Sequence, residues 1–428
     1  MAEAFRVTGG RRLAGCITPA GNKNEMLPAI AAALLTDEEV VLENVPDILD
    51  VRTMLQVVAG LGAQVERRGS HTIAIRARAL TSSTLDPELS ARIRGSFLLC
   101  GPLLARRGEA VLAPPGGDRI GRRRVDTHLL AMIGLGAELD PGEALIMRAP
   151  EGLVGAELFL DEASVTATEN AVMAAAVARG ATVIHNAACE PHVRNLCDML
   201  NRMGARISGA GSNILRIEGV DRLHGTAHRI GPDFLEVGSF IGLAAATRSA
   251  LTIRDACPRD LHMVRITLRR LGLEIEIEGE DVHVPAGQEL RVRQDFGGAI
   301  PKIDDAPWPG FPADLVSIAL VVATQAEGTV LIHEKMYESR LFFVDRLIDM
   351  GARIVLCDPH RAVIAGPCRL HGASISSPDI RAGMALLIAA LCADGVSTIH
   401  NIQQIDRGYE RIDERLRALG AGLERIDA

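Results

Sequence analysis

One glycine- and arginine-rich segment has the residue types that bind an anion. The run from Pro114 to Asp126 holds two prolines, three glycines and four arginines. Glycine lets backbone N–H groups approach a bound anion, and guanidinium groups grip phosphate or carboxylate with two parallel hydrogen bonds. The segment is neither a P-loop nor a dinucleotide-binding fingerprint. A solvated basic turn is the alternative, but clustered arginines in an acidic chain favour an anion site.

Other cations could join such a site. Lys23, in Gly21-Asn22-Lys23-Asn24, precedes an apolar run predicted to be helical, so its charge would lie beside a helix N-terminus. Isolated arginines occur at Arg94, Arg340, Arg381 and Arg407. For each of these residues alone, a helix cap or a surface ion pair is at least as good an explanation as an anion site. The argument for an anion site therefore rests on all five residues together.

Motifs for metal binding or nucleophilic catalysis are weak. His224 and His228 are four residues apart, but Gly225 lies between them and no third ligand is evident. His333-Glu334 lacks the second histidine of a zinc protease, and no nucleophile elbow is present. The sequence therefore predicts neither a metal nor a cofactor.

Composition narrows the class of protein. The chain has 428 residues, a length that predicts two or three domains, and 48% of its residues are hydrophobic, as in globular proteins. Its net charge of −8 argues against general nucleic-acid binding. No apolar stretch has the length of a membrane span, and the start lacks a signal-like apolar region. Eight cysteines without a Cys-x-x-Cys pair indicate reduced thiols. We expect a cytoplasmic protein with no membrane insertion.

The elements that position these residues repeat along the chain. A helical segment that ends in Leu-Gly or Met-Gly and is followed by a strand-like run occurs six times, with glycines at Gly62, Gly136, Gly204, Gly272, Gly351 and Gly420. Each glycine is a predicted left-handed helix cap. A second marker, a turn and then a β-branched run such as Gly328–His333, recurs in phase. Unrelated α/β segments with common caps are the alternative, but two markers in phase favour repeated α/β units.

Six repeats divide naturally into two halves of three. The midpoint falls near Arg229–Asp233, where Pro232 is a plausible crossover, and no low-complexity linker separates the halves. Because ligand sites form preferentially between domains, we expect the anion site in a cleft between the halves.

Four motifs together resemble the UDP-N-acetylglucosamine 1-carboxyvinyltransferase family. They are the Gly-x-Lys-Asn pattern ending at Asn24, the run Pro115–His128, the run Ser164–Asn170 and the closing run Ile405–Ile412. The resemblance runs from Phe5 to Ile426. It implies the α/β enolpyruvyl transferase fold, an inside-out α/β barrel with two domains, each of three βαβαββ units around buried helices. The implied domains are 23–231, with a mobile loop Pro114–Arg124, and 1–22 plus 232–428.

The resemblance also implies a reaction. The enolpyruvyl group of phosphoenolpyruvate moves to the 3′-hydroxyl of UDP-N-acetylglucosamine with release of phosphate, the first committed step of peptidoglycan synthesis, and no cofactor is needed. Lys23, Arg123 and Arg407 would hold the phosphate, and Arg340 and Arg381 the carboxylate. The sugar-nucleotide site would comprise Asn24, Arg94, Arg123, Arg124, Val125, Asp126, Thr127, Ser164, Val165, Asp314 and Met336. Asp314 would be the base that accepts the hydroxyl proton.

One position of the loop departs from the family. Its members usually carry Cys at the fourth position of Pro-Gly-Gly-x, where this chain has Asp118. We expect Asp118 to protonate the methylene carbon of phosphoenolpyruvate as the loop closes over the substrates. The antibiotic fosfomycin alkylates the family's loop thiol, and a carboxylate is a much poorer nucleophile, so we expect intrinsic fosfomycin resistance.

Other departures leave the acceptor open. Unusual residues for the family are Leu49, Glu162, Phe234 and Gln404. The alternatives are an enolpyruvyl transferase with another nucleotide or sugar acceptor, or a non-catalytic paralogue that binds sugar nucleotides. The shikimate-pathway enzyme shares the fold but has Ser where this chain has Asn24. We expect a monomer or a weak homo-oligomer.

Overall fold

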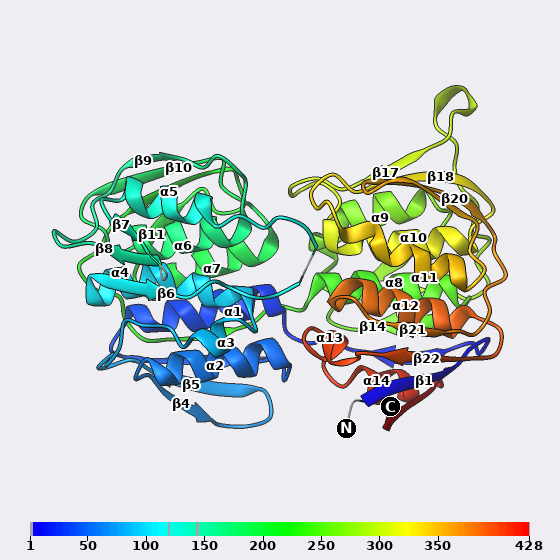
Figure 1. Cartoon of the computed structure of the whole chain (residues 1–428), viewed down its shortest axis with the longest axis horizontal. Coiled ribbons are helices and arrows are strands. Elements are labelled where there is room, and N and C mark those ends of the chain that lie inside the picture. Colours follow the sequence, from blue (N-terminus) through cyan, green and yellow to red (C-terminus); the bar gives the residue numbers. More distant parts are fainter. Residues whose placement is uncertain (1–2, 119, 143–144, 428) are drawn as a thin grey trace. The chain divides into compact units, whose positions relative to one another are not determined.

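A computed structural model describes residues 3–118, 120–142 and 145–427, which form two compact units (Figure 1). The first unit comprises residues 21–118 and 123–231, and the second comprises the described residues of 1–20, 119–122 and 232–428. The predicted domain boundaries, after residues 22 and 231, differ from these in placing residues 21–22 with the second domain and residues 120–122 with the first. That the active site lies between the domains stays a prediction.

The first unit contains three small sheets. Their strand orders are β13-β3-β5-β4, β6-β8-β7 and β11-β12-β10-β9. The strands are β3 (Glu39–Glu43), β4 (Gln64–Arg67), β5 (Thr72–Arg76), β6 (Glu109–Leu112), β7 (Glu138–Pro141), β8 (Leu145–Arg148), β9 (Glu157–Phe159), β10 (Ala181–His185), β11 (Arg206–Ser208), β12 (Ile214–Glu218) and β13 (Thr226–Arg229).

The second unit also contains three sheets. Their orders are β21-β22-β1-β23, β15-β16-β14-β2 and β17-β18-β20-β19. The strands are β1 (Glu3–Thr8), β2 (Ala14–Ile17), β14 (Ala250–Ile253), β15 (Glu276–Glu278), β16 (Asp281–Val284), β17 (Lys302–Asp304), β18 (Gly328–His333), β19 (Ile354–Asp358), β20 (Arg361–Gly366), β21 (Ser374–Ser376), β22 (Val396–His400) and β23 (Gly422–Asp427). The amino-terminal strand β1 thus pairs with β22 and β23 near the other end of the chain.

Strand pairing follows one rule throughout. Each four-stranded sheet has one parallel pair, such as β17 with β18, and its other pairs are antiparallel. In the three-stranded sheet, a parallel bridge between Thr84 and Val111 takes the place of the fourth strand. In the repeats β9–β12 and β17–β20 a helix joins the two parallel strands, so the chain reads strand, helix, strand, helix, strand, strand. In the sheets that contain β3 and β14, the parallel partners β13 and β2 come from distant parts of the chain. The predicted α/β fold class, built from βαβαββ units, is confirmed.

Each repeat supplies one inner helix to the core of its unit. The inner helices are α1 (Lys23–Ala32), α4 (Cys100–Arg107) and α6 (Val165–Ala175) in the first unit, and α8 (Phe234–Ala246), α10 (Val316–Gln325) and α12 (Ile380–Cys392) in the second. Every residue of α8 is buried, and α10 and α12 are nearly so. A helix that is apolar all round must lie in a core, and each unit has its own hydrophobic cluster.

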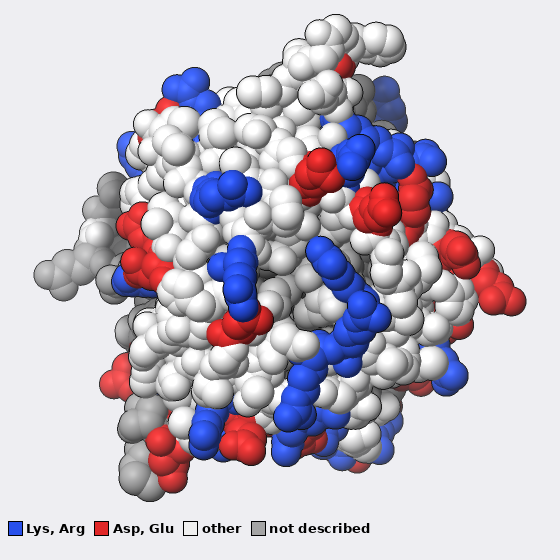
Figure 2. Space-filling view, turned by 90° about the vertical axis from the view of Figure 1, so that its right-hand side faces the viewer, with Lys and Arg blue, Asp and Glu red and all other residues white. Residues whose placement is uncertain are grey.

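The second helix of each repeat covers the outside. These helices are α2 (Leu49–Gly60), α5 (Asp126–Gly134), α7 (Pro191–Arg202), α9 (His262–Arg269), α11 (Val344–Asp349) and α14 (Ile412–Ala418), with short helices α3 (Pro87–Ser90) and α13 (Gln403–Asp406) in loops. Basic and acidic side chains both occur across the face drawn in Figure 2, as on an ordinary solvated surface. No helix within residues 3–118, 120–142 and 145–427 is long and apolar enough to cross a membrane.

The six repeat glycines all adopt the left-handed conformation. Their φ angles are 103° (Gly62), 91° (Gly136), 101° (Gly204), 85° (Gly272), 98° (Gly351) and 97° (Gly420). The prediction of left-handed caps after the outer helices is therefore confirmed.

Gly136 offers a clean test of this cap. A Cβ added there would meet no atom within 4 Å, so only the backbone conformation opposes a side chain. Gly136→Ala should lower the free energy of unfolding by about 1–2 kcal/mol. Gly60→Ala is the matched control, since Gly60 lies in the last turn of α2 with open space and no positive φ. It should be neutral or stabilising. Urea unfolding of both variants measures the difference, and equal effects would contradict the cap.

Candidate active site

The starts of the inner helices carry several of the predicted site residues. Side chains cap four of these helices, with Asn22, Ser164, Asp233 and Asp379 accepting hydrogen bonds from backbone N–H groups of the first turn. Lys23, Asn24, Val165 and Arg381 lie in those first turns. Arg94 and Asp314 lie in the 3₁₀ turns before the two remaining inner helices, Arg94–Leu99 before α4 and Ala313–Leu315 before α10. Helix N-termini attract anions, so the helix starts of each unit have the groups that suit an anion.

In the second unit, two buried guanidinium groups share one carboxylate. Arg340 Nη2 donates to Asp314 Oδ1 at 2.7 Å, and Arg381 Nε donates to Asp314 Oδ2 at 3.1 Å. Both arginines are only 4% exposed, whereas the Asp314 side chain keeps 28% of its surface. The structure thus brings together three predicted site residues, and the shared carboxylate is the part that reaches solvent.

Aromatic rings complete this cluster. The Arg381 guanidinium lies 5.6 Å from the ring centre of Tyr409, and its Nη1 donates to the Tyr409 hydroxyl at 3.2 Å. The hydroxyl also bonds to Ser239 Oγ at 2.9 Å. Burial raises the pKa of Tyr409, so the phenol stays protonated. The Arg340 guanidinium similarly lies 5.0 Å from the Tyr337 ring. The rings fix the guanidinium planes by cation–π contact.

Two capping aspartates add negative charge nearby. Asp379 Oδ1 accepts from Arg381 N at 2.8 Å, and Asp233 Oδ1 accepts from Leu235 N at 2.9 Å. Burial raises the pKa of Asp233, opposed by the charge of Arg381. Neither aspartate was predicted from sequence, although an Asp two residues before Arg381 and one before Phe234 are ordinary helix-cap signals.

Arg407 and Met336 lie on turns that follow central strands. Arg407 comes directly after α13, and its Nη1 donates to Gln404 Oε1 at 2.9 Å. Gln404 is one of the residues unusual for the resembled family, so this departure contacts a predicted phosphate ligand. Met336, on the turn after β18, is 39% exposed.

In the first unit, Lys23 forms a buried ion pair. Its Nζ lies 3.2 Å from Asp50 Oδ2, and the two side chains are 12% and 6% exposed. Asp50 lies in the first turn of α2, beside the unusual Leu49. Sequence reasoning missed Asp50 because nothing local connects it with Lys23. The ion pair orients the ammonium at the start of α1.

Asp161 organises the predicted sugar-nucleotide residues of the first unit. Its Oδ1 accepts from Thr127 Oγ1 at 2.7 Å, and its Oδ2 lies 2.5 Å from Arg124 Nη2. Arg94 Nη2 donates to the Arg124 carbonyl at 2.6 Å. Asp126 Oδ2 lies 3.5 Å from Arg124 Nε. The structure therefore brings Arg94, Arg124, Asp126 and Thr127 together, with Asp161 as the partner that sequence reasoning missed.

A buried histidine joins the outer and inner helices beside these residues. Asn170 Nδ2 lies 3.1 Å from His128 Nδ1, and His128 Nε2 lies 3.0 Å from Thr166 Oγ1. Burial lowers the pKa of His128 to about 3, so the ring is neutral. The amide of Asn170 also accepts from Gly101 N at 2.7 Å. These contacts tie the starts of α5 and α6 to α4.

The predicted anion-binding loop is irregular. Residues 113–118 and 120–125 form neither helix nor strand, and Asp118 is half-buried. Arg119, one of its four arginines, lies outside the described residues. A Cβ on Gly116 would lie 1.8 Å from the Ala91 carbonyl oxygen, so only glycine fits there. Within the second unit, Ile120 is buried and its carbonyl accepts from Ser339 N at 3.1 Å.

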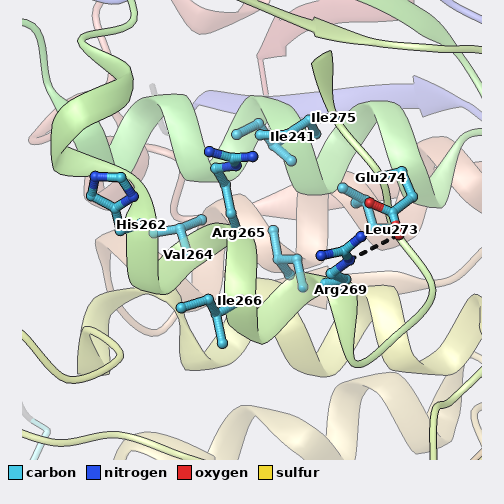
Figure 3. Close-up of a pocket in the computed structure, with 10 residues that line it drawn as sticks. Ile241, His262, Val264, Arg265, Ile266, Arg269, Leu273, Glu274 and Ile275 are labelled. Carbon is cyan, nitrogen blue, oxygen red and sulfur yellow. Dashed lines mark hydrogen bonds and ion pairs between the residues drawn. The ribbon is translucent and has the colours of Figure 1, made fainter. Parts of the chain in front are cut away.

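A separate pocket of about 240 Å³ lies beside α9 (Figure 3). It is lined by Ile241, Leu268, Leu273 and Ile275 among others, and Arg269 pairs with Glu274 at its rim at 3.0 Å. None of the predicted site residues lines it. Among the described residues, no group of three or more His, Cys, Asp and Glu side chains could hold a metal ion.

Comparison with known proteins identifies the fold class. Residues 7–416 match the sequence profile of the family described as EPSP synthase (3-phosphoshikimate 1-carboxyvinyltransferase). The crystal structure of the enolpyruvyl transferase NikO from Streptomyces tendae superposes with a TM-score of 0.88 at 26% identity, covering 100% of this chain and 99% of that one. The fold is that of the enolpyruvyl transferases.

Curated relatives narrow the family. Proteins named UDP-N-acetylglucosamine 1-carboxyvinyltransferase from Treponema denticola and Treponema pallidum are 57% and 58% identical to this chain. The alignments cover 98% of this chain and 98% and 99% of the two relatives. The chain belongs to the UDP-N-acetylglucosamine 1-carboxyvinyltransferase family.

Proposed function

We propose that this protein transfers the enolpyruvyl group of phosphoenolpyruvate to the 3′-hydroxyl of UDP-N-acetylglucosamine and releases phosphate. The reaction would serve as the first committed step of peptidoglycan synthesis in the cytoplasm. The buried Arg340–Asp314–Arg381 cluster carries the proposal, because it joins two cations that suit a carboxylate with a carboxylate that can act as base. The full-length identity to named relatives supports the choice of acceptor.

The cations divide between the two charged groups of phosphoenolpyruvate. Lys23, Arg123 and Arg407 would bind the phosphate, and Arg340 and Arg381 the carboxylate. Asp50 and Gln404 support this assignment, since they hold Lys23 and Arg407 in place through their side chains. The two buried arginines are held rigidly by Asp314 and the two tyrosine rings, so little side-chain entropy is lost when a carboxylate binds.

Two carboxyl groups would move the protons. Asp314 accepts the proton of the sugar hydroxyl as its oxygen forms the new C–O bond, while Asp118 donates a proton to the methylene carbon. Phosphate then leaves the tetrahedral adduct as the methyl group formed by this protonation returns a proton to the Asp118 carboxylate and the enol double bond is restored. Asp118 would be able to donate only when protonated, so its loop must place it beside the substrate and away from water.

The acceptor side would lie around α5 and α6. Asn24, Arg94, Val125, Ser164, Val165 and Met336 would contact the sugar nucleotide, together with Arg124, Asp126 and Thr127. The hydrogen bonds of Arg94 and Thr127 support this group, because they hold the start of α5 in one conformation.

Phosphate release tests the proposed function directly. With phosphoenolpyruvate and UDP-N-acetylglucosamine, the purified protein should release phosphate, and without the sugar nucleotide it should not. Arg381→Lys keeps the positive charge but cannot form the bidentate hydrogen bonds of a guanidinium group with a carboxylate, so kcat/KM for phosphoenolpyruvate should fall about tenfold or more. Arg369→Lys, an exposed arginine paired with Asp394, is the matched control. Release with a different nucleotide sugar only would point to another acceptor, and no release with any acceptor would refute the transferase.

Asp118→Asn removes the proposed acid with almost no change in shape. We expect kcat to fall about 10²–10⁴-fold, the usual contribution of a general acid. Hydrogen exchange into the methylene group of phosphoenolpyruvate, followed in deuterated water, should disappear in parallel. Full phosphate release by Asp118→Asn would show that another group donates the proton.

Fosfomycin sensitivity should follow the residue at position 118. The wild-type protein should keep its activity after incubation with fosfomycin, because a carboxylate attacks an epoxide much more slowly than a thiolate does. Asp118→Cys should become sensitive in a time-dependent manner and gain the mass of one inhibitor molecule. Time-dependent inactivation of the wild-type protein with an adduct at Asp118 would contradict this expectation.

A further inference from the structure

Two acidic side chains lie at the ends of neighbouring parallel strands, close to Arg340. Strands β17 and β18 are paired with Asp304 opposite His333, so the residues that follow, Asp305 and Glu334, come next in register. Both side chains are fully buried, with 0% exposure. Buried carboxyl groups are rare unless they are paired or hydrogen-bonded, so the pair needs an explanation.

The pair holds the turn that leads to Arg340. Asp305 accepts from Lys335 N at 2.5 Å and from Met336 N at 3.2 Å, while Glu334 Oε1 accepts from Met336 N at 3.3 Å and from Tyr337 N at 3.1 Å. Three successive backbone N–H groups are thus bound by two side chains. Tyr337, whose ring faces the Arg340 guanidinium, belongs to this turn.

The second oxygen of Glu334 faces the arginine without bonding to it. Glu334 Oε2 lies 3.8 Å from Arg340 Nε, and neither of these buried atoms has a hydrogen-bond partner among the described residues. A charged oxygen in that position would be costly, and a buried carboxyl in this situation takes up a proton instead. Burial, together with the nearby carboxyl of Asp305, outweighs the opposing charge of Arg340 and raises the pKa of Glu334 to about 9.

The internal repeat gives independent support for a neutral group. In three other repeats, the residue directly after the corresponding strand is an asparagine whose amide donates to a carbonyl that follows the parallel partner strand. These pairs are Asn44 with Ile230, Asn186 with Leu160, and Asn401 with Ser377. In these three repeats a neutral side chain occupies the position that Glu334 has after β18, whereas the charged residues Arg254 and Asp255 follow β14.

We propose that Glu334, kept in its protonated form beside Asp305, is a positioning residue for Arg340, and that its ionisation weakens phosphoenolpyruvate binding. The inference rests on the proposed function, in which Arg340 binds the substrate carboxylate. A neutral Glu334 shapes the turn without placing a second anion beside Arg340, whose guanidinium already bonds to Asp314. An ionised Glu334 would attract the same guanidinium and repel Asp305, which disturbs both the cation and the turn.

Other charged and titratable groups surround Glu334 and Arg340. They are Asp305 after β17, Asp314 before α10, Asp379 before α12, Tyr337 on the turn itself, and His360 between β19 and β20, whose Nδ1 lies 2.8 Å from the Glu334 carbonyl. Any effect of these groups, and of lysines elsewhere, should be the same in the wild-type protein and in variants at position 334. The comparison of such variants therefore isolates the Glu334 carboxyl.

The test is the pH dependence of KM for phosphoenolpyruvate. In the wild-type protein, KM should rise about tenfold from pH 8 to pH 10, as the binding-competent fraction falls with loss of the Glu334 proton. Glu334→Gln keeps a neutral side chain of the same shape, so its KM should change by less than about twofold over this range. Asp305→Asn removes the neighbouring charge and should shift the rise to lower pH. Asp304→Asn, a partly exposed neighbour paired with Lys335, is the matched control and should behave as wild type.

An infrared measurement separates this inference from the proposed function. Burial also raises the pKa of Glu169 well above its usual range, so the measurement is a difference spectrum between the wild-type protein and Glu334→Gln. The carbonyl band of a protonated carboxylic acid should be present in this difference at pH 7 and lost from it above pH 10. An alkaline rise of KM that is identical in wild type and Glu334→Gln would overturn the inference, as would absence of the band. Absence of phosphate release with the band present would reject the proposed function and leave the protonated Glu334 established.

Discussion

One carboxylate shared by two buried guanidinium groups is the interaction on which the candidate site depends. Arg340 and Arg381 come from different repeats, and each would carry an expensive isolated charge without Asp314. The ion pairs offset the cost of burial, and the tyrosine rings hold both side chains in one orientation. The cluster therefore exists only when two repeats of the second unit, that of β17–β20 and that of α12, are packed together, which couples the fold directly to the candidate site.

The repeat explains why charged residues gather at helix starts. The inner helices of the second unit are almost wholly buried, so the backbone groups that they can offer to a ligand are the unpaired N–H groups of the first turn. Caps such as Asn22 and Asp379 satisfy some of these groups, and the neighbouring Lys23 and Arg381 add full charges. The same inner helices of the βαβαββ unit thus form the apolar core and carry, at their starts, the polar and charged groups that suit an anion.

Sequence reasoning found the local features of this fold and missed the distant partners. The cap glycines and the strand–helix alternation were predictable because Gly62 or Gly136 needs only its own backbone conformation to be recognised. Asp50, Asp161 and Glu334 were missed because their roles depend on strand register and on side chains tens of residues away. Tyr409 was part of a quoted motif, but its contact with Arg381 requires the packing of α12 against the turn after β22.

Two of the residues that are unusual for the resembled family, Phe234 and Gln404, make well-defined contacts of their own. Phe234, where an arginine is common in the resembled family, is buried and packs edge-on against Trp308 with ring centres 5.5 Å apart, so an apolar contact stands in place of a charge. Gln404, where a histidine can occur, accepts from Arg407. An amide is neutral at every pH, whereas a histidine could protonate and repel the guanidinium. Because Gln404 contacts a cation assigned to phosphoenolpyruvate, this departure bears on the donor substrate and does not weaken the assignment of the acceptor.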